Sequence, residues 1–248
     1  MVINPGKTQL MQLKPLQEEP LSIQLDGSVI QNQDSIKILG LTIGNDLKFD
    51  QFIWKDKSSL VKRIQNKTSQ IVVLRSFLPT KTLHQVGNAI LNSTIQYGAA
   101  IWGATSDQNI NKVQAAQIRA ARILTRKWKK KDDGTHRQQI LDLVKWPNVQ
   151  QLVSSATLNL TKQVISGKSS TGMNCLFRVK RPPRGNRNSG LRIQHRGKPD
   201  RGETTFAVNA TNKFNKLPIT LRAPELSIKS FKNGLKNHIK TSYKLPQH

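Results

Sequence analysis

The chain has 248 residues, 36% of them hydrophobic, and no apolar run near the eighteen residues that a membrane-spanning helix needs. It is long enough to bury a core, and its polar, acid-containing start is unlike a secretory signal, so we expect a soluble intracellular protein of the nucleus or cytoplasm with no membrane partner. The single cysteine, Cys175, excludes an internal disulfide and a Cys-based zinc site, and we expect no disulfide-linked partner.

The charge is strongly positive and unevenly distributed. Lys and Arg number 40 against 14 Asp and Glu, and residues 111–248 hold 29 of these cations with 6 acids, against 11 and 8 in residues 1–110. Such a field attracts polyanions, because each phosphate that a cation neutralises releases counterions. We therefore expect RNA or DNA as the partner, bound largely without regard to sequence. The alternative is a basic surface that serves only solubility.

The first fifty residues predict a small β unit. Gln9 to Leu13 is typical of a strand, Leu21 to Leu25 alternates between apolar and polar residues, and Asp26-Gly27 signals a tight turn. A second β-rich run extends from Ile36 to Ile43, with Gly40 inside it. A glycine within a strand either lets another backbone approach closely or marks a bulge.

Three stretches have the apolar spacing of amphipathic helices, and we expect them to pack as one three-helix domain at residues 51–131. They span residues 52–76, 81–102 and 107–126. The second stretch organises the domain, because its apolar residues recur three, four or seven apart and end on a large ring. We expect one buried face on it, formed by Leu83, Val86, Ile90, Tyr97, Ile101 and Trp102.

The third of these helices carries the sharpest functional signal. Its cations are spaced seven, three and four residues apart, which places them on one helical face. Like charges at such spacings cost helix stability, and a phosphate backbone would remove that repulsion. The alternative is a solvated helix end, where cations also suit the helix dipole. The predicted contacts are Lys112, Arg119, Arg122 and Arg126, then the run Lys127, Trp128, Lys129, Lys130 and Lys131, with Lys62, Arg63 and Lys67 on the first helix.

No catalytic carboxylates are recognisable. Asp132-Asp133 follows three lysines and precedes Gly134, which is the context of a loop, and no other pair of carboxylates stands in an apolar, strand-like setting. Two-metal phosphoryl transfer needs such ligands. The five histidines also lack the spacing of metal ligands or nucleophiles. We therefore predict no catalytic residue, no metal site and no cofactor bound by this chain.

Residues 132–248 predict a basic C-terminal region with two helices. The first, at 148–166, follows Trp146-Pro147 and is typical of a core helix. The second, at 227–240, is capped by Ser227 and has one apolar face. Between them, residues 178–202 are rich in Arg, Lys, Gly and Pro and predict an extended or hairpin-like basic arm. Its expected nucleic-acid contacts are Arg181, Arg184 and Arg187.

A series of short motifs resembles the non-LTR (LINE-type) retrotransposon reverse transcriptases. Their order along the chain matches the end of the palm and the thumb and C-terminal region after it, with Phe214 standing where tryptophan is usual. The resemblance implies a remnant of the palm at residues 1–50, a thumb-like domain at 51–131 and the C-terminal region at 132–248. The motifs are Asn4-Pro5-x-Lys7-Thr8, Leu39-Gly40, Phe77-Leu78-Pro79, Tyr97-Gly98, Trp102-Gly103, Asn215-x-Leu217-Pro218 and Leu221-Arg222.

The catalytic Phe/Tyr-Ala-Asp-Asp segment of that family does not occur in this chain. The resemblance therefore implies a truncated fragment of an RNA-directed DNA polymerase that retains nucleic-acid-binding parts and is inactive alone, with Mg²⁺ implied only for the complete polymerase. The alternative is a self-standing basic RNA- or DNA-binding protein without polymerase ancestry. We expect a fold that is mostly α with a small N-terminal β unit (α+β), a thumb-like helical bundle followed by a basic, partly irregular C-terminal region.

Overall fold

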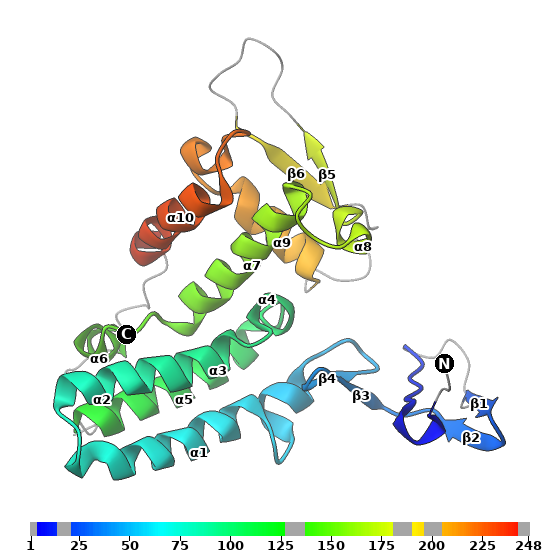
Figure 1. Ribbon diagram of the computed structural model, residues 1–248, viewed down its shortest axis with the longest axis horizontal. Coiled ribbons are helices and arrows are strands. Elements are labelled where there is room, and N and C mark those ends of the chain that lie inside the picture. Colours follow the sequence, from blue (N-terminus) through cyan, green and yellow to red (C-terminus); the bar gives the residue numbers. More distant parts are fainter. Residues whose placement is uncertain (1–3, 14–20, 127–136, 181–189, 196–204, 243–248) are drawn as a thin grey trace. The chain divides into compact units, whose positions relative to one another are not determined.

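The computed structural model describes residues 4–13, 21–126, 137–180, 190–195 and 205–242 (Figure 1). The chain forms two units, Met1–Lys62 and Arg63–His248, which divide within the first turn of helix α1 (Leu60–Val73). Within the described ranges, helices dominate, and the strands pair in three antiparallel two-stranded sheets. The predicted fold class, mostly α with a small N-terminal β unit, is confirmed. The division at residues 50 and 131 stays a prediction.

The first unit contains two β-hairpins with the same kind of turn. Strands β1 (Ser22–Leu25) and β2 (Ser28–Gln31) flank Asp26-Gly27, and β3 (Ser35–Ile38) and β4 (Leu41–Gly44) flank Leu39-Gly40. Both turn residues have positive φ in each case, as two-residue type I′ turns require. Gly40 therefore forms a turn and does not lie within a strand, so that interpretation of the run 36–43 was wrong.

Two other expectations for the first sixty residues also need correction. Gln9 to Leu13 forms no strand, and Leu10 makes only an isolated bridge to Asn32, after a short 3-10 turn η1 (Pro5–Lys7). The predicted helix 52–76 is interrupted. A π-helical turn η2 (Gln51–Lys55) comes first, Asp56 is extended, and α1 starts at Leu60 and ends in the 3-10 turn η3 (Leu74–Ser76).

The predicted helix 81–102 is divided into four pieces, which changes its buried face. A π-helical turn adds a residue per turn and rotates the residues after it, and Gly98, with a φ of 63°, then breaks the helix. Tyr97 is consequently 51% exposed and Ile101 46%, while Trp102 is fully buried. Ile90 is exposed as well, and Leu91 and Ile95 are buried instead. The pieces are α2 (Thr80–Gly87), η4 (Asn88–Asn92), α3 (Ser93–Gln96) and α4 (Ala99–Trp102).

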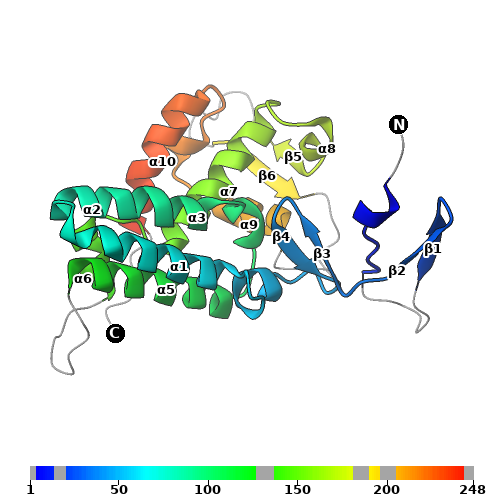
Figure 2. The same ribbon diagram turned by 60° about the horizontal axis from the view of Figure 1, so that its bottom comes forward.

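The central helices of the larger unit pack against one another, and Trp102 on α4 is fully buried. Helix α5 (Asp107–Thr125) lies beside α6 (Arg137–Val144) (Figure 2). Helix α4 packs against α7 (Val149–Ile165) (Figure 1). Gly103 permits this close packing, because a Cβ there would lie 2.4 Å from Cγ1 of Val153. Helix α7 was predicted at 148–166 and starts with a capping box.

The C-terminal part of the larger unit has its own apolar core, which includes side chains from the C-terminal half of α7. Strand β5 pairs with β6, so the described part of the basic arm is a hairpin, one of the two forms expected. This core includes Phe177, Ile193, Phe214 and Phe231. Its elements are α8 (Thr171–Asn174), β5 (Phe177–Lys180), β6 (Arg192–His195), α9 (Phe206–Asn215), the 3-10 turn η6 (Ile219–Arg222) and α10 (Ile228–Ser242), the last predicted at 227–240.

Candidate nucleic-acid interface

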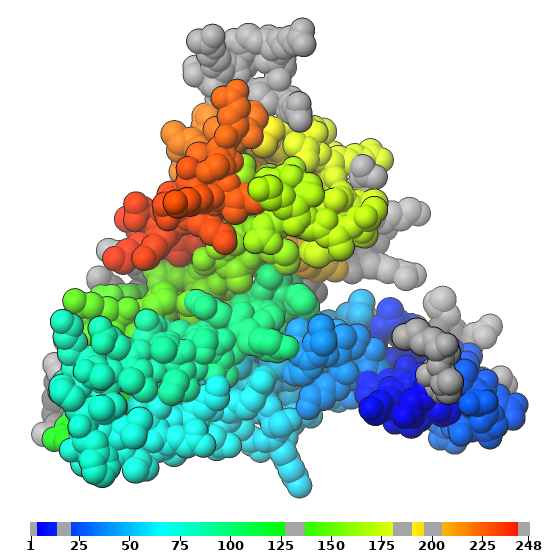
Figure 3. All heavy atoms as spheres, in the orientation of Figure 1, coloured from blue at the N-terminus to red at the C-terminus, as the bar shows by residue number. Residues whose placement is uncertain are grey.

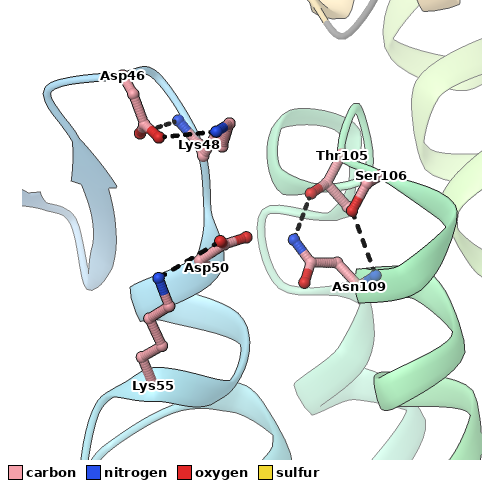
Figure 4. A network of polar contacts seen from close by, with 7 residues as sticks. All are labelled: Asp46, Lys48, Asp50, Lys55, Thr105, Ser106 and Asn109. Atoms are coloured by element: carbon pink, nitrogen blue, oxygen red, sulfur yellow. Dashed lines mark hydrogen bonds and ion pairs between the residues drawn. The ribbon is translucent and has the colours of Figure 1, made fainter.

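Local sequence defines where α5, the helix with the predicted cationic face, begins and ends. The Ser106 hydroxyl accepts a hydrogen bond from the backbone N–H of Asn109 at 3.4 Å, and the Asn109 amide donates to the Thr105 hydroxyl at 2.8 Å (Figure 4). The first of these bonds occupies one of the free N–H groups of the first turn. At the other end Arg126 adopts a left-handed conformation with φ of 57°, which stops the helix.

A buried network of side-chain amides fixes the rotation of α5 about its axis. Gln117 is fully buried, and its amide donates both to the Asn92 side chain and to the Pro147 carbonyl, each at 2.8 Å. Gln114 donates to Gln117 at 2.9 Å and accepts from the backbone of Val149 at 2.8 Å. Because each bond has a fixed direction, the network links α5 to η4 and to the start of α7 in one arrangement. The opposite face of α5 therefore has a defined orientation.

The four predicted cations of α5 lie on that opposite side. Arg119 and Arg126 are exposed, whereas Lys112 and Arg122 are half-buried. At 100° per residue the four positions fall within an arc of about 80°, although Arg126 itself lies just past the last helical residue. The helix thus places two exposed arginines and two half-buried cations on a single strip of surface.

The three predicted cations of α1 differ in their surroundings. Lys62, at the end of the first unit, is exposed. In the larger unit Arg63 is half-buried, and burial lowers the pKa of its guanidinium, while the nearby Tyr97 raises it. The Lys67 ammonium donates to the Thr94 hydroxyl at 2.8 Å, so this lysine is engaged within the fold. Lys67 is therefore the weakest candidate of the three.

The remaining predicted contacts lie outside the described residues. They are Lys127, Trp128, Lys129, Lys130, Lys131, Arg181, Arg184 and Arg187, together with the pair Asp132-Asp133.

The C-terminal part of the larger unit carries cations that were not among the predicted contacts, although Arg178, Lys180 and Arg192 fall within the predicted basic arm. Within the described residues of 149–242, twelve Lys and Arg side chains accompany one acidic side chain, Glu225. On the hairpin, Lys180 pairs directly with Arg192, and Arg178 points to the same solvent face. Like charges directly opposite each other destabilise a sheet. The signal was visible as alternating cations at 178 and 180, but the strand pairing was needed to bring Arg192 beside them.

Several carboxylates in the described residues serve local structure. In the first unit Asp46 and Asp50 form ion pairs with Lys48 at 3.2 Å and Lys55 at 3.6 Å (Figure 4). Across the described ranges, no three His, Cys, Asp or Glu side chains are grouped as metal ligands would be. In the same ranges, no helix has the length and apolar character needed to cross a membrane.

The fold and surface define a basic, mostly helical protein with cations on several exposed faces. No protein-family model matches the sequence, and no solved structure matches it. Over 128 residues, or 50% of this chain, the sequence is 27% identical to a Drosophila melanogaster protein named "Probable RNA-directed DNA polymerase from transposon BS". The matched segment is only 14% of that protein's length. The similarity supports a relationship with the transposon RNA-directed DNA polymerases.

Proposed function

We propose that this chain is a fragment from the C-terminal portion of a non-LTR (LINE-type) retrotransposon RNA-directed DNA polymerase, and that it binds RNA or DNA without containing the catalytic aspartates. The observation that carries the proposal is the strip of cations on α5, which the buried Gln117 network holds facing outward. The partial similarity to a transposon polymerase supports the same conclusion.

The helices from α1 to α5 take the role of a thumb-like domain in this proposal, and the first fifty residues that of a palm remnant. Arg119 and Arg126 are the principal phosphate ligands on α5, because both are exposed and a guanidinium can donate two parallel hydrogen bonds to one phosphate. Lys112 and Arg122 contribute mainly to the local positive potential. Contacts of this kind position a nucleic acid and do not read its sequence.

The test is the salt dependence of binding to a fluorescent duplex and to a single strand. Each phosphate contact contributes about 0.9 to the slope of log affinity against log salt for a duplex. The double variant Arg119→Gln and Arg126→Gln should therefore flatten that slope by about 1.8 for every sequence tested. The matched control is Lys81→Gln with Lys145→Gln, which removes the same charge from exposed positions, one of them also at a helix end with positive φ.

An unchanged slope in the Arg119/Arg126 variant, or equal changes in variant and control, would reject the α5 interface. A second variant, Trp128→Ala, should lower affinity for single strands by about 1 to 3 kcal/mol and leave the slope nearly unchanged, because stacking involves no counterion release. We also expect no primer extension on an RNA template with Mg²⁺ or Mn²⁺. Extension above a buffer control would contradict the assignment of this chain to a part without catalytic aspartates.

The competing function, a self-standing basic RNA- or DNA-binding protein, rests on the same cations and predicts the same binding results. The coding sequence upstream of Met1 separates the two. An in-frame or degraded Ala-Asp-Asp segment there supports the polymerase origin, and unrelated sequence supports the alternative.

A further inference from the structure

Helix α10 carries a second row of cations. Lys229, Lys232, Lys236 and Lys240 are all exposed, and at 100° per residue they fall within an arc of about 80° on the outer face. We name these four residues the lysine row. The segment lies at the surface in the space-filling view, where it is coloured orange to red (Figure 3). The row is about 16 Å long, since about eleven residue steps of 1.5 Å separate its ends.

The opposite face of α10 is fully used by the core of its own unit. Phe231, Leu235 and Ile239 are only 0%, 1% and 5% exposed, and the helix packs along α7. The buried Lys162 of α7 places its ammonium 5.7 Å from the centre of the Phe231 ring. Gly234 allows close approach to Leu221, since a Cβ there would lie 2.6 Å from the leucine Cδ2. The helix is therefore held in one orientation, and so is the lysine row.

Helix stability does not explain this row. Lys232 and Lys236, like Lys236 and Lys240, are four residues apart, a spacing at which like charges repel. Only Lys240 lies in the last turn, where the helix dipole favours a cation, and Lys229 lies in the first turn, where the dipole opposes one. No acidic residue occurs within α10, and none of the four lysines has an ion-pair partner among the described residues.

We propose that the lysine row of α10 binds the phosphate backbone of a double-stranded nucleic acid, as a second contact surface besides α5. This inference rests on the proposed nucleic-acid-binding function. One strand of a duplex presents a charge about every 3.4 Å along its axis but winds around that axis, so a straight row of about 16 Å faces several phosphates and not a full run of successive ones. Asn233 and Asn237, exposed beside the row, add uncharged donors of the kind that bind phosphate oxygens.

The chemistry of the surface favours a duplex over a single strand. The exposed positions of α10 include no aromatic ring on which an unpaired base could stack. A flexible single strand would also lose conformational entropy when ordered along a rigid row, whereas a duplex is already straight. Lysines act on phosphates as point charges, so the contact carries no base preference.

An anionic membrane is the other partner that a basic amphipathic helix could serve. Such a helix inserts its apolar face among the lipid acyl chains. In α10 that face is already buried in the protein core by Phe231, Leu235 and Ile239. Membrane attachment would therefore lack the contribution of a buried apolar face. Binding to a duplex does not require that contribution, because it depends only on the exposed lysines.

The experiment compares two triple variants of the full chain. The row variant loses three charges through Lys232→Gln, Lys236→Gln and Lys240→Gln. Glutamine is used because its helix propensity is close to that of lysine. The matched control, Lys145→Gln, Lys168→Gln and Lys216→Gln, removes three exposed charges that lie outside α10. Binding to a duplex of about 20 base pairs, to a single strand of the same length and to phosphatidylserine vesicles is measured between about 50 and 200 mM salt, with circular dichroism melting to verify folding.

We expect the row variant to flatten the slope of log affinity against log salt for the duplex by about 2.7. Between about 50 and 200 mM salt, the affinity of the variant should therefore fall by a factor about 40 times smaller than that of the wild type. The single-strand slope should change less, and the control should lose less than about one unit of slope. Equal effects in the row variant and the control would overturn the inference, as would a loss of vesicle binding with intact duplex binding. Wild-type protein that binds no nucleic acid at all would instead reject the proposed function itself.

Discussion

The two cores of the larger unit satisfy their buried polar groups in different ways. Where α5 meets η4 and the start of α7, buried side-chain amides mostly bond one another, with Gln117 joined to Gln114, to Asn92 and to one backbone carbonyl. Around Phe231, the half-buried Asn215 and the buried Arg222 instead bond backbone groups of Leu191, Ile193 and Leu217. Both arrangements disfavour other packings of these side chains, because a buried donor or acceptor without its partner costs about 1 to 3 kcal/mol.

In the C-terminal core, Asn215 and Arg222 hold strand β6 and the residue before it. The Asn215 amide accepts from the backbone N–H of Ile193 at 3.0 Å and donates to its carbonyl at 2.8 Å. Arg222 donates from Nε to the Leu217 carbonyl at 2.8 Å and from Nη1 to the Leu191 carbonyl at 3.1 Å. The burial of Arg222 and the proximity of Arg192 both lower its guanidinium pKa. These bonds give a structural reason for the Asn215 and Leu221-Arg222 motifs.

The difference between the cores determines how each cationic surface is presented. The amide network sets the rotation of one helix, so α5 presents a strip of cations that includes two exposed arginines. The main-chain bonds hold β6, whose outer face carries Arg192, while the same core holds α10 with its lysine row. We expect damage to the first core to affect binding through α5, and damage to the second to affect binding through α10.

Truncating the central ring of either core should have the largest effect. Trp102→Ala and Phe231→Ala each remove a fully buried aromatic side chain, which typically costs about 3 to 5 kcal/mol. Thermal denaturation followed by circular dichroism measures the loss, and Phe77→Ala, at an exposed ring, is the control. If Trp102→Ala left the melting transition unmoved, the helices would not form a cooperative unit around it.

Breaking the amide network should cost somewhat less. Gln117→Leu has a similar volume but leaves the Asn92 oxygen, the Pro147 carbonyl and the Gln114 amide without their partner, at an expected cost of about 2 to 4 kcal/mol. Gln108→Leu makes the same chemical change at an exposed position of α5 and should be nearly neutral. Urea denaturation compares the two, and equal midpoints would show that the network adds no stability.

Removing the arginine of the second core should cost about 1.5 to 3 kcal/mol. Arg222→Met keeps much of the volume but loses hydrogen bonds from a charged donor to two carbonyls. Its control, Arg192→Met, removes an exposed cation that repels Arg222, so it should be neutral or slightly stabilising. A larger loss in the control than in Arg222→Met would contradict the role assigned to these bonds. Amide hydrogen exchange at Leu191 and Ile193 would report the release of β6.

Apolar periodicity predicted the helices that depend on a single uninterrupted face. Helices α5, α7 and α10 lie within one or two residues of their predicted ends, with caps at Ser106, Asn148 and Ser227. The same reasoning failed for residues 81–102, because a π-helical turn shifts the spacing of the buried positions and no residue type in the sequence signals such a turn. It failed at Gly40 as well, where a turn and a strand glycine have the same local sequence.

The candidate site was predictable where it depends on one helix. The spacing of Lys112, Arg119 and Arg122 was enough to place them on one strip of α5. The buried partners of that helix were not predictable, since Gln114 and Gln117 look like ordinary surface residues until long-range contacts bury them. The lysine row of α10 has a similar spacing in the sequence, but only the packing of the opposite face shows that the row is held outward.

The smallest predicted effect depends on pH and concerns Lys213 in α9. Burial lowers the pKa of its ammonium to about 8 from an ordinary 10.5. Between these two pKa values the unfolded chain binds more protons at this site than the folded chain. The free energy of unfolding should therefore increase as the pH is raised from about 8 toward 10.5. Because one pKa unit corresponds to about 1.4 kcal/mol, the gain from about pH 8 to about pH 10 is on the order of 2 kcal/mol. Lys213→Met should abolish this rise, whereas Lys216→Met, at an exposed position just beyond α9, should preserve it. The free energy of unfolding in urea at several pH values measures both, and a Lys213→Met curve parallel to wild type would show that the ammonium is not desolvated in the fold.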